Sequence, residues 1–392
     1  MSYYPHQKFR QAIRGPQLSA IAEFKRRSPS MGDIRPDARV EEILPAYERG
    51  GAAAISVLVD ERFAGSVDDL RAARAATTVP LLAKGFFSTE EHLREVREAG
   101  ADAALLILRD LDDETATRLV GYAEQIGLET LVEAHDEDEL HRAMRVGDGL
   151  TGVNARNLST FAIDRSEQLP LVAFARFLDD FVVAESGIHT RVQAAEAELA
   201  GAHAVLVGTS LMQASDPEAK LRELIARPLV KVCGLTRQED VDAAVDAGAD
   251  MVGFIFAEGS PRQAPAVLDV PDTVLSVAVS VGEPEERGAD LVQVYEPEEG
   301  KVRGAHGYLG SKHGRRFVWD LPWGERDPAA WKNAPPELVR TGMLAGGLGP
   351  DNVRAAINAL QPWAVDAASR LESAPGIKDY AKVHAFVEAA RG

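Results

Sequence analysis

The stretch Leu229-Val-Lys-Val-Cys-Gly-Leu-Thr236 marks the point where the chain begins a second time. It holds the only cysteine, Cys233, on an apolar run typical of the first strand of a domain. Before it a strand-then-helix pattern recurs, and after Arg227-Pro228 the pattern restarts. The sequence therefore predicts two tandem α/β domains, residues 1–227 and residues 228–392, each with reactive side chains at the end of its first strand.

Composition and charge limit the possible functions. The 392 residues are enough for two domains, and 45% hydrophobic with 27% charged residues is ordinary for a globular protein. A formal charge of -18 argues against nucleic acid or an anionic membrane as a partner, although a pocket can be locally basic and bind a phosphorylated small molecule. The single cysteine fits a reducing compartment, and neither a membrane-spanning run nor a signal segment is found, so we expect a cytoplasmic protein.

Short apolar runs divide the first half. They are rich in Ala, Val, Ile and Leu without strict alternation, as expected for strands covered on both faces. Stretches with apolar residues at helical spacing, such as Glu90–Ala99 and Asp136–Val146, lie between them. The predicted strands are Ala20–Phe24, Ala52–Val59, Val79–Lys84, Ala101–Leu108, Leu128–Ala134, Leu150–Arg156, Phe181–Glu185 and Ala202–Gly208.

Gly-Ala pairs punctuate this repeat. A left-handed glycine can end one helix just before the next strand, as at Gly51-Ala52 and Gly100-Ala101. Eight strand–helix units in about 210 residues favour a (β/α)8 TIM barrel. A doubly wound open sheet is the alternative, and the lack of a Gly-x-Gly-x-x-Gly fingerprint after the first strand disfavours it.

Polar side chains stand at the carboxyl ends of these strands, which share one mouth in a barrel. One lysine or glutamate at such a place is usually a solvated loop residue. Together, lysines, carboxyl groups and an arginine can protonate a carbonyl, move a second proton and hold an anion. Turns at Gly187 and Gly208-Thr-Ser210 follow the last two strands, where barrels often bind phosphate. The strand-end residues are Glu23, Lys25, Ser56, Lys84, Glu133, Asn154, Arg156, Glu185 and Ser186.

Seven segments make the first half, from about residue 9 to 214, resemble indole-3-glycerol-phosphate synthase. That family is a (β/α)8 barrel that closes an indole ring with loss of carbon dioxide and water. The segments are Ile21-Ala-Glu-Phe-Lys-Arg-Arg-Ser-Pro-Ser30, Ala54-Ile-Ser-Val-Leu-Val-Asp60, Pro80-Leu-Leu-Ala-Lys84, Leu131-Val-Glu133, Gly152-Val-Asn-Ala-Arg-Asn-Leu158, Ala184-Glu-Ser-Gly-Ile188 and Gly208-Thr-Ser-Leu-Met212.

The resemblance implies a role for each strand end. Lys84 would be the general acid on the substrate ketone, Glu133 its acid/base partner with Asn154 beside it, and Glu23 and Lys25 would complete the catalytic set. The other implied residues would bind substrate. Arg156 would face the anthranilate carboxylate, and most of the rest would lie near the phosphate. These others are Ser28, Glu185, Ser186, Gly187, Gly208, Thr209 and Ser210.

Two features depart from the synthase pattern. Gly85 stands where the family usually has Asp, which removes a charge from the mouth. The family also usually carries a helical segment ahead of the barrel, whereas few residues precede Phe9, so we expect a less complete substrate lid.

The second half repeats the pattern with shorter connections. Helices are predicted at Arg237–Ala247 and Pro350–Leu360, and the turn Gly346-Gly-Leu-Gly349 that opens the second is a phosphate-site candidate. The predicted strands are Met251–Phe256, Leu275–Val281, Leu291–Tyr295, Arg316–Asp320, Gly342–Ala345 and Ala364–Ala367, with a weak one near Lys301–Leu309.

This half resembles phosphoribosylanthranilate isomerase, and the order synthase-then-isomerase is that of fused bifunctional enzymes of tryptophan biosynthesis. The resemblance implies Cys233 as general base and Asp320 as general acid of a sugar-opening and enol–keto rearrangement. Arg262 would hold the substrate carboxylate. The implied phosphate-site residues are Gly346, Gly347 and Ser369. The matching segments are Lys231-Val-Cys-Gly-Leu-Thr236, Gly253-Phe-Ile-Phe256, Ser260-Pro-Arg262, Leu344-Ala-Gly-Gly-Leu348 and Leu371-Glu-Ser-Ala-Pro-Gly-Ile-Lys-Asp379.

The second half departs further from its family. Gln293-Val-Tyr-Glu296 replaces Gln-Leu-His-Gly, the loop Leu321–Asp327 is altered, and Arg370 replaces a small residue. Residues 228–392 are few for a barrel, which usually has roughly 200 or more. The connections after Val281 and Tyr295 are too short for crossover helices, so we expect several outer helices to be loops.

Something must then cover the apolar outer faces of these strands. Rearranged loops, the first barrel or a second copy of the chain are the alternatives. Loops are favoured, because Glu283–Arg287 and Lys301–Arg303 supply charge for a solvated rim.

Two functions remain open from sequence alone. The leading one is a bifunctional enzyme acting on phosphorylated anthranilate-derived substrates. The alternative is an active synthase whose second half is decayed, has changed substrate or serves as a structural module. A lone cysteine on an apolar strand is often a core residue, but the motif around Cys233 and the retained Asp320 favour catalysis. No His/Cys cluster has ligand spacing, so neither a metal nor an organic cofactor is expected.

Overall fold

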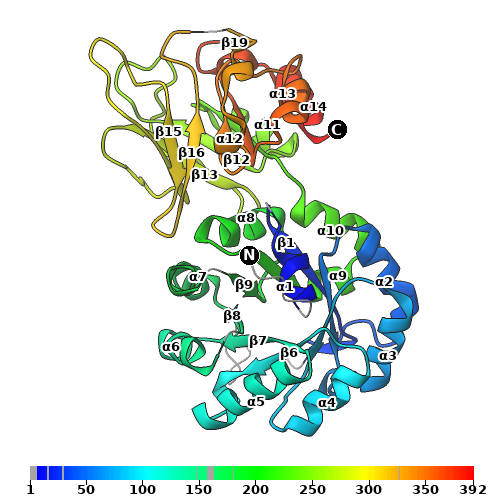
Figure 1. The fold of residues 1–392 in the computed structure, drawn as a ribbon. Coiled ribbons are helices and arrows are strands. Elements are labelled where there is room, and N and C mark those ends of the chain that lie inside the picture. The colour runs from blue at the N-terminus through cyan, green and yellow to red at the C-terminus, as the bar shows by residue number, and fades with distance from the viewer. Residues whose placement is uncertain are drawn as a thin grey trace. The chain divides into compact units, whose positions relative to one another are not determined.

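The computed structural model describes residues 7–15, 17–28, 31–147, 149–156, 163–179, 181–325 and 327–392. Four positions of the quoted motifs lie outside these residues, namely Pro29, Ser30, Asn157 and Leu158. The chain separates into two compact units, residues 1–225 and residues 226–392, and each unit holds one closed barrel (Figure 1). The predicted class of two tandem barrels is confirmed.

The first barrel is built from parallel strands in the order β1-β10-β9-β8-β7-β6-β5-β4. Nearly every strand residue is buried, because one face lines the interior and the other packs against helices. The strands are β1 (Ser19–Phe24), β4 (Ala54–Leu58), β5 (Leu81–Lys84), β6 (Ala103–Ile107), β7 (Glu129–Ala134), β8 (Leu150–Asn154), β9 (Val182–Glu185) and β10 (Ala204–Val207). Each one overlaps a predicted strand.

Helices surround this barrel (Figure 1). Many begin at a side-chain cap: Ser66, Thr89 and Asp112 each accept a hydrogen bond from a backbone N–H three residues later. The long helices are α2 (Val40–Arg49), α3 (Val67–Ala76), α4 (Glu90–Glu98), α5 (Asp113–Gln125), α6 (Glu137–Val146), α7 (Arg165–Leu178), α8 (Arg191–Ala200) and α10 (Pro217–Ile225). Shorter elements are α1 (Lys8–Ile13), β2 (Arg27–Ser28), β3 (Gly32–Asp33), η1 (Glu61–Phe63), η2 (Leu108–Asp110) and α9 (Thr209–Gln213).

The second barrel closes in the order β11-β12-β13-β14-β15-β16-β17-β18. Its strands are β11 (Leu229–Cys233), β12 (Met251–Ile255), β13 (Leu275–Val281), β14 (Leu291–Tyr295), β15 (Gly307–Gly310), β16 (Arg315–Trp319), β17 (Met343–Leu344) and β18 (Ala364–Ala367). Unlike the others, β15 runs antiparallel to both of its neighbours, a reversal that the sequence analysis did not anticipate. The four residues 311–314 that join β15 to β16 explain it, because a parallel crossover needs a dozen or more.

Helices are fewer around the second barrel, as expected from its length (Figure 1). They are α11 (Gln238–Asp246), α12 (Pro336–Val339), α13 (Val353–Leu360) and α14 (Tyr380–Arg391), with the 3-10 turns η3 (Ala330–Asn333) and η4 (Ser369–Leu371) and the hairpin β19 (Glu372–Ala374) and β20 (Ile377–Lys378). Residues 282–290 after β13 and residues 296–306 after β14 contain no helix.

Loops cover the outer face of β13. The outward residue Ala278 belongs to an apolar cluster against which the loop residues Val267, Leu268 and Ala289 pack. A second outward residue, Ser276, donates its hydroxyl to Asp290 Oδ2 at 2.6 Å. Because the outward residues Ser276 and Ala278 are small, a loop fills the space that a helix would occupy elsewhere. The favoured alternative, cover by rearranged loops, therefore describes this face.

Candidate active sites

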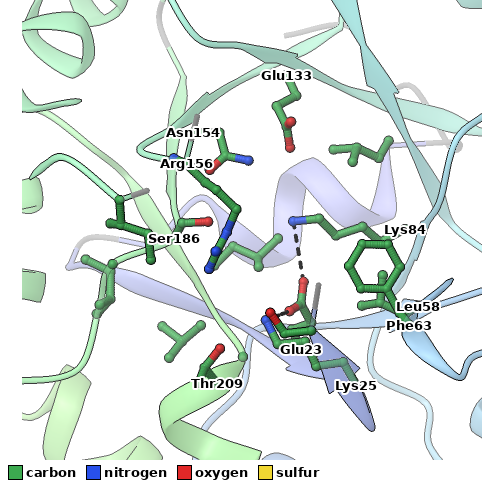
Figure 2. Close-up of a pocket in the computed structure, with 18 of the residues that line it drawn as sticks. Glu23, Lys25, Leu58, Phe63, Lys84, Glu133, Asn154, Arg156, Ser186 and Thr209 are labelled. Carbon is green, nitrogen blue, oxygen red and sulfur yellow. Dashed lines mark hydrogen bonds and ion pairs between the residues drawn. The ribbon is translucent and has the colours of Figure 1, made fainter. Parts of the chain in front are cut away.

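A cavity of about 380 Å³ occupies the mouth of the first barrel (Figure 2). Most of the predicted site residues line it, namely Glu23, Lys25, Ser28, Lys84, Glu133, Asn154, Arg156, Ser186, Gly187, Gly208 and Thr209. Two predicted residues lie behind its wall. Glu185 is fully buried under Lys84, and Ser210 donates its hydroxyl to Ile188 O at 3.0 Å.

Lys84 stands at the centre of the charged groups (Figure 2). Its Nζ donates to Glu185 Oε2 at 2.8 Å and lies 3.4 Å from Glu23 Oε2. The other oxygen of Glu23 is 2.7 Å from Lys25 Nζ. Two lysines are thus held between buried carboxylates that come from different strands.

Burial and neighbouring charges set the protonation of this cluster. Burial disfavours the ionised form of Glu23, yet Lys25 and Lys84 together lower its pKa to about 2. Burial also opposes the charge on Lys84, but Glu185, Glu23 and Glu133 raise its pKa above the ordinary value, so it is an ammonium at neutral pH. For Glu185, burial and the nearby Glu133 raise the pKa despite the contact with Lys84. Lys84 therefore presents a protonated ammonium to the cavity.

Glu133 is backed by a histidine that the sequence analysis missed. His135 Nε2 lies 3.2 Å from Glu133 Oε1, and its Nδ1 lies 3.0 Å from Glu139 Oε2. Arg109 Nε in turn donates to Glu139 Oε1 at 2.9 Å. Although burial acts against it, the two carboxylates raise the pKa of His135 to about 9. The sequence carries little signal for this contact, because His135 precedes helix α6 (Glu137–Val146), so its spacing from Glu139 does not place the two on one helical face.

One oxygen of Glu133 remains open to a ligand. Glu133 Oε2 is buried and has no hydrogen-bond partner within the described residues. Burial raises the pKa of this carboxyl, but His135 and Lys84 outweigh burial and lower it. Glu133 is thus an unprotonated carboxylate with a free acceptor. Asn154 lies beside it, and its Oδ1 accepts from the Arg156 backbone N–H at 2.9 Å (Figure 2).

Two backbone features let the polar groups converge. A Cβ on Gly208 would lie 2.3 Å from Glu23 Oε1, so a larger residue there would displace the carboxylate. Ser186 has a φ of 67°, which is uncommon for a residue other than glycine, and Gly187 follows with 71°. Such conformations cluster at functional sites. Arg156 extends into the cavity from the side opposite Lys84 (Figure 2).

The second mouth brings Cys233 together with two buried charges. Lys231, on the same strand, is fully buried, and its Nζ lies 3.3 Å from Asp366 Oδ2 on β18. Cys233 itself is only 5% exposed. Lys231 lies in a quoted motif and Asp366 on a predicted strand, and neither has a role predicted from the sequence.

Asp320 accepts hydrogen bonds from two residues at the same oxygen. Tyr295 Oη donates to Asp320 Oδ2 at 2.7 Å, and Arg303 Nη2 donates to it at 2.6 Å. Gln293 Nε2 donates to Tyr295 Oη at 2.5 Å, and the Arg303 guanidinium lies 4.0 Å from the centre of the Tyr295 ring. The expectation that Arg303 belongs to a solvated rim is wrong. A buried carboxylate attracts it inward, whereas Lys301 stays exposed.

The remaining predicted residues of this mouth lie in ion-paired surroundings. Arg262 donates from Nε and Nη2 to the two oxygens of Glu372, at 2.7 and 2.8 Å, so its guanidinium is paired. Gly346 and Gly347 have positive φ angles of 80° and 68°. Arg370 crosses this turn and donates to Gly347 O at 2.9 Å. Ser369 begins η4 beside it.

Neither mouth contains a metal-type donor set in the described chain: no group of three or more His, Cys, Asp or Glu side chains there is arranged to hold an ion. Across the same residues no helix is long and apolar enough to cross a membrane. The fold and the two clusters define a pair of TIM-barrel acid–base sites, the first built on lysine and glutamate and the second on cysteine and aspartate.

Comparison with known proteins gives the family. The family model for indole-3-glycerol phosphate synthase matches residues 2–224, and the model for N-(5'-phosphoribosyl)anthranilate isomerase matches residues 327–389. The indole-3-glycerol phosphate synthase of a Nocardioides species is 49% identical over 217 residues, which are 54% of this chain and 82% of that protein. That of Streptomyces griseus is 45% identical over 218 residues, 55% and 80% of the two chains. The chain belongs to the indole-3-glycerol phosphate synthase family.

One of the solved structures similar to this chain covers less than half of it. TrpF from Jonesia denitrificans is 31% identical, with 42% of this chain and 98% of that chain covered and a TM-score of 0.31.

Proposed function

We propose that the chain is a bifunctional enzyme of tryptophan biosynthesis. The second barrel isomerises phosphoribosylanthranilate to carboxyphenylamino-deoxyribulose phosphate. The first barrel closes that product to indole-3-glycerol phosphate with loss of carbon dioxide and water. The observation that carries the proposal is the order of the two family matches, synthase at residues 2–224 and isomerase at residues 327–389, on a chain with two closed barrels.

In the synthase barrel, Lys84 protonates the substrate ketone, since it is an ammonium that faces the cavity. The open oxygen of Glu133 takes part in the second proton transfer. Glu23 and Lys25 hold Lys84 and the substrate in place, and Arg156 pairs with the anthranilate carboxylate. The phosphate binds by the turns after β9 and β10, whose residues are Ser186, Gly187, Gly208, Thr209 and Ser210, with Ser28 beside them.

In the isomerase barrel, Asp320 gives a proton to the ring oxygen of the sugar and Cys233 removes one from the adjacent carbon. Burial raises the pKa of Asp320 above its ordinary value, which suits a proton donor. Arg262 binds the substrate carboxylate when Glu372 releases it, and Gly346, Gly347 and Ser369 bind the phosphate. Because Cys233 acts as a base only when its thiol is reduced, the proposed reaction also supports a cytoplasmic location.

The alternative, a synthase with an inactive second half, is not favoured. A purely structural module has no need of the buried polar groups at this mouth, because each costs free energy unless it is satisfied. Lys231, Cys233, Asp320 and Asp366 are all less than 10% exposed.

Separate assays of the two reactions test the proposal. Purified full-length protein should convert phosphoribosylanthranilate to the ring-opened ketone. The loss of anthranilate fluorescence measures this conversion. Supplied with that ketone directly, it should form indole-3-glycerol phosphate. If the second reaction proceeds and the first does not, the inactive-module alternative is correct. If neither proceeds, the bifunctional assignment fails.

A further inference from the structure

Lys231 is a buried charge that the reaction steps above do not use. Its side chain has no exposed surface, and its Nζ has no hydrogen-bond partner within the described residues, although Asp366 Oδ2 is 3.3 Å away. Burying an ammonium in this way costs free energy that packing does not return. A residue of this kind is therefore expected to serve another group nearby.

The position of Gly253 shows which group that is. Gly253 pairs with Cys233 in the sheet register. A Cβ on Gly253 would lie 2.7 Å from Cys233 Sγ and 2.9 Å from Lys231 Nζ. The sulfur and the ammonium thus approach the same point in the barrel interior, which is open only because this residue is glycine.

We propose that Lys231 is a positioning residue whose buried ammonium, next to Cys233 in the mouth of the second barrel, favours the thiolate form of Cys233 against the effect of burial. The proposal rests on the isomerase function given above, because that function requires a base at Cys233. Lys231 stays protonated throughout. The proton taken from the substrate carbon goes to Cys233 Sγ, and Lys231 supplies only the positive charge that stabilises the thiolate beforehand.

The charges around the thiol act in opposite directions. Burial raises the pKa of Cys233 above its ordinary value and Asp366 adds to the rise, while Lys231 and, to a smaller extent, Lys378 on β20 oppose it. Asp366 and Cys233 in turn raise the pKa of Lys231 against the effect of burial. Cys233 also interacts electrostatically with Arg303, which donates to Asp320 together with Tyr295. Lys231 is the cation whose Nζ lies with Cys233 Sγ at the Cβ position of Gly253.

Two features of composition make the thiol measurable in the intact chain. Cys233 is the only cysteine, so thiolate absorbance at 240 nm reports this group alone once a Cys233→Ser protein is subtracted as a blank. All four tryptophans, Trp319, Trp323, Trp331 and Trp363, lie in the second barrel. Their fluorescence therefore verifies that this barrel is folded in each variant.

The test is a pH titration of the thiolate in wild type, Lys231→Met and Asp366→Asn. An opposite charge within about 4–6 Å shifts a pKa by 1–3 units, so Lys231→Met should raise the thiol pKa by about one unit or more. The thiolate fraction at neutral pH should fall about tenfold. Asp366→Asn should lower the pKa instead. In denaturant all three proteins should titrate alike.

Opposite shifts separate the proposal from a structural role. If Lys231 only supported packing, both substitutions would loosen the site and move the thiol pKa toward the denatured value together. A Lys231→Met thiol pKa equal to or below that of wild type overturns the proposal. Should Lys231→Met fail to fold, the double variant Lys231→Met/Asp366→Asn removes the unpaired carboxylate, and its thiol pKa must exceed that of Asp366→Asn alone.

Isomerase kinetics distinguish this proposal from the proposed function. The acid limb of the kcat profile should move upward in Lys231→Met by the same amount as the thiol pKa. If the wild type shows no isomerase activity, the function fails while the titration still decides whether Lys231 controls the thiol.

Discussion

The first barrel places a helix between each pair of neighbouring strands, whereas the second closes with loops after β12, β13 and β14 and with β15 reversed. Both nevertheless form complete rings of strands with buried interiors. The difference teaches that closure depends on the strand register and on what ties each strand to the next. The outer helices supply cover, and small outward residues with well-fitted loops can replace them.

The two mouths differ in how far their charged groups are enclosed. The first is an open cavity in which two lysines are interleaved with carboxylates. In the second, the connection after β14 brings Arg303 inward onto Asp320, and the reacting groups are nearly enclosed. Reversal of β15 is the cause, because the start of this strand then lies at the mouth instead of its end.

The strongest way to break the comparison is to inactivate one barrel at a time. Lys84→Ala removes the proton donor and should lower synthase turnover by about 10² or more. Cys233→Ala should lower isomerase turnover by a similar factor. Each variant should leave the other reaction at the wild-type rate, since the two clusters belong to separate units. The measurement is kcat for each half-reaction with its own substrate.

A near-normal synthase rate in Lys84→Ala would show that another group is the acid. Lys84→Arg is the matched control, because it keeps the charge near Glu185 and Glu23 but changes the position of the donor. It should fold as well as wild type and remain slow.

A smaller effect is expected from one added methyl group in each mouth. Gly208→Ala would bring a Cβ to 2.3 Å from Glu23 Oε1, and Gly253→Ala would bring one to 2.7 Å from Cys233 Sγ. Each should lower kcat of its own reaction by about tenfold, because displacing a reacting group by about 1 Å is costly. Gly121→Ala is a control, since nothing lies within 4 Å of the added atom. Equal effects of all three would mean that the close approaches are irrelevant.

Sequence alone could predict most of the strands and their chemistry. Lys84 and Glu133 end apolar runs, and in a parallel barrel this alone brings them to one mouth. The fate of Arg303 could not be predicted, because its partner Asp320 is seventeen residues away and a charged loop is usually solvated. The reversal of β15 had a signal in the four-residue link 311–314, which is too short for a crossover.

A third prediction uses pH to sharpen the comparison. His135 has its pKa raised to about 9 from an ordinary 6.5, so the stability that it contributes is complete below about 6.5 and is lost as the pH rises through 9. In His135→Asn this decline of the first barrel should disappear. The acid limb of the synthase profile should also move upward, because Glu133 loses a cation that lowers its pKa. Urea unfolding by circular dichroism at pH 6.5 and 9 measures the first effect.

The second barrel supplies the control for this pH effect. His135 belongs to the first unit, so the isomerase pH profile of His135→Asn should match that of wild type. An unchanged synthase profile with an unchanged stability profile would mean that His135 is neutral in the folded protein.

The smallest effects concern a device that both barrels share. A Gly-Ala-Asp triplet precedes one strand of the first barrel and two of the second, and its aspartate binds a backbone N–H at the start of the preceding strand. Asp102 Oδ2 accepts from Leu81 N at 3.0 Å, Asp250 Oδ2 from Val230 N at 2.7 Å and Asp290 Oδ2 from Ser276 N at 2.8 Å. A helix precedes Asp102 and Asp250, but only a loop precedes Asp290. The hydrogen bond from the aspartate to the neighbouring strand therefore forms with or without a preceding helix.

Replacing each of these aspartates with alanine should measure how much its hydrogen bond contributes to the free energy of unfolding. Asp250→Ala leaves a buried N–H without its acceptor and removes the ion pair with Arg391, and it should lower the free energy of unfolding by about 3 kcal/mol. Asp290 is exposed, so water can replace it and Asp290→Ala should cost only about 1 kcal/mol. Tryptophan fluorescence during urea unfolding reports both losses, and Asp102→Ala should leave this signal unchanged, because the first barrel has no tryptophan. Asp290→Ala could instead prove as destabilising as Asp250→Ala. The hydrogen bond from Asp290 would then be the main contact that replaces the missing helix after β13. Small outward residues and loop packing would not be enough to explain the closed second barrel.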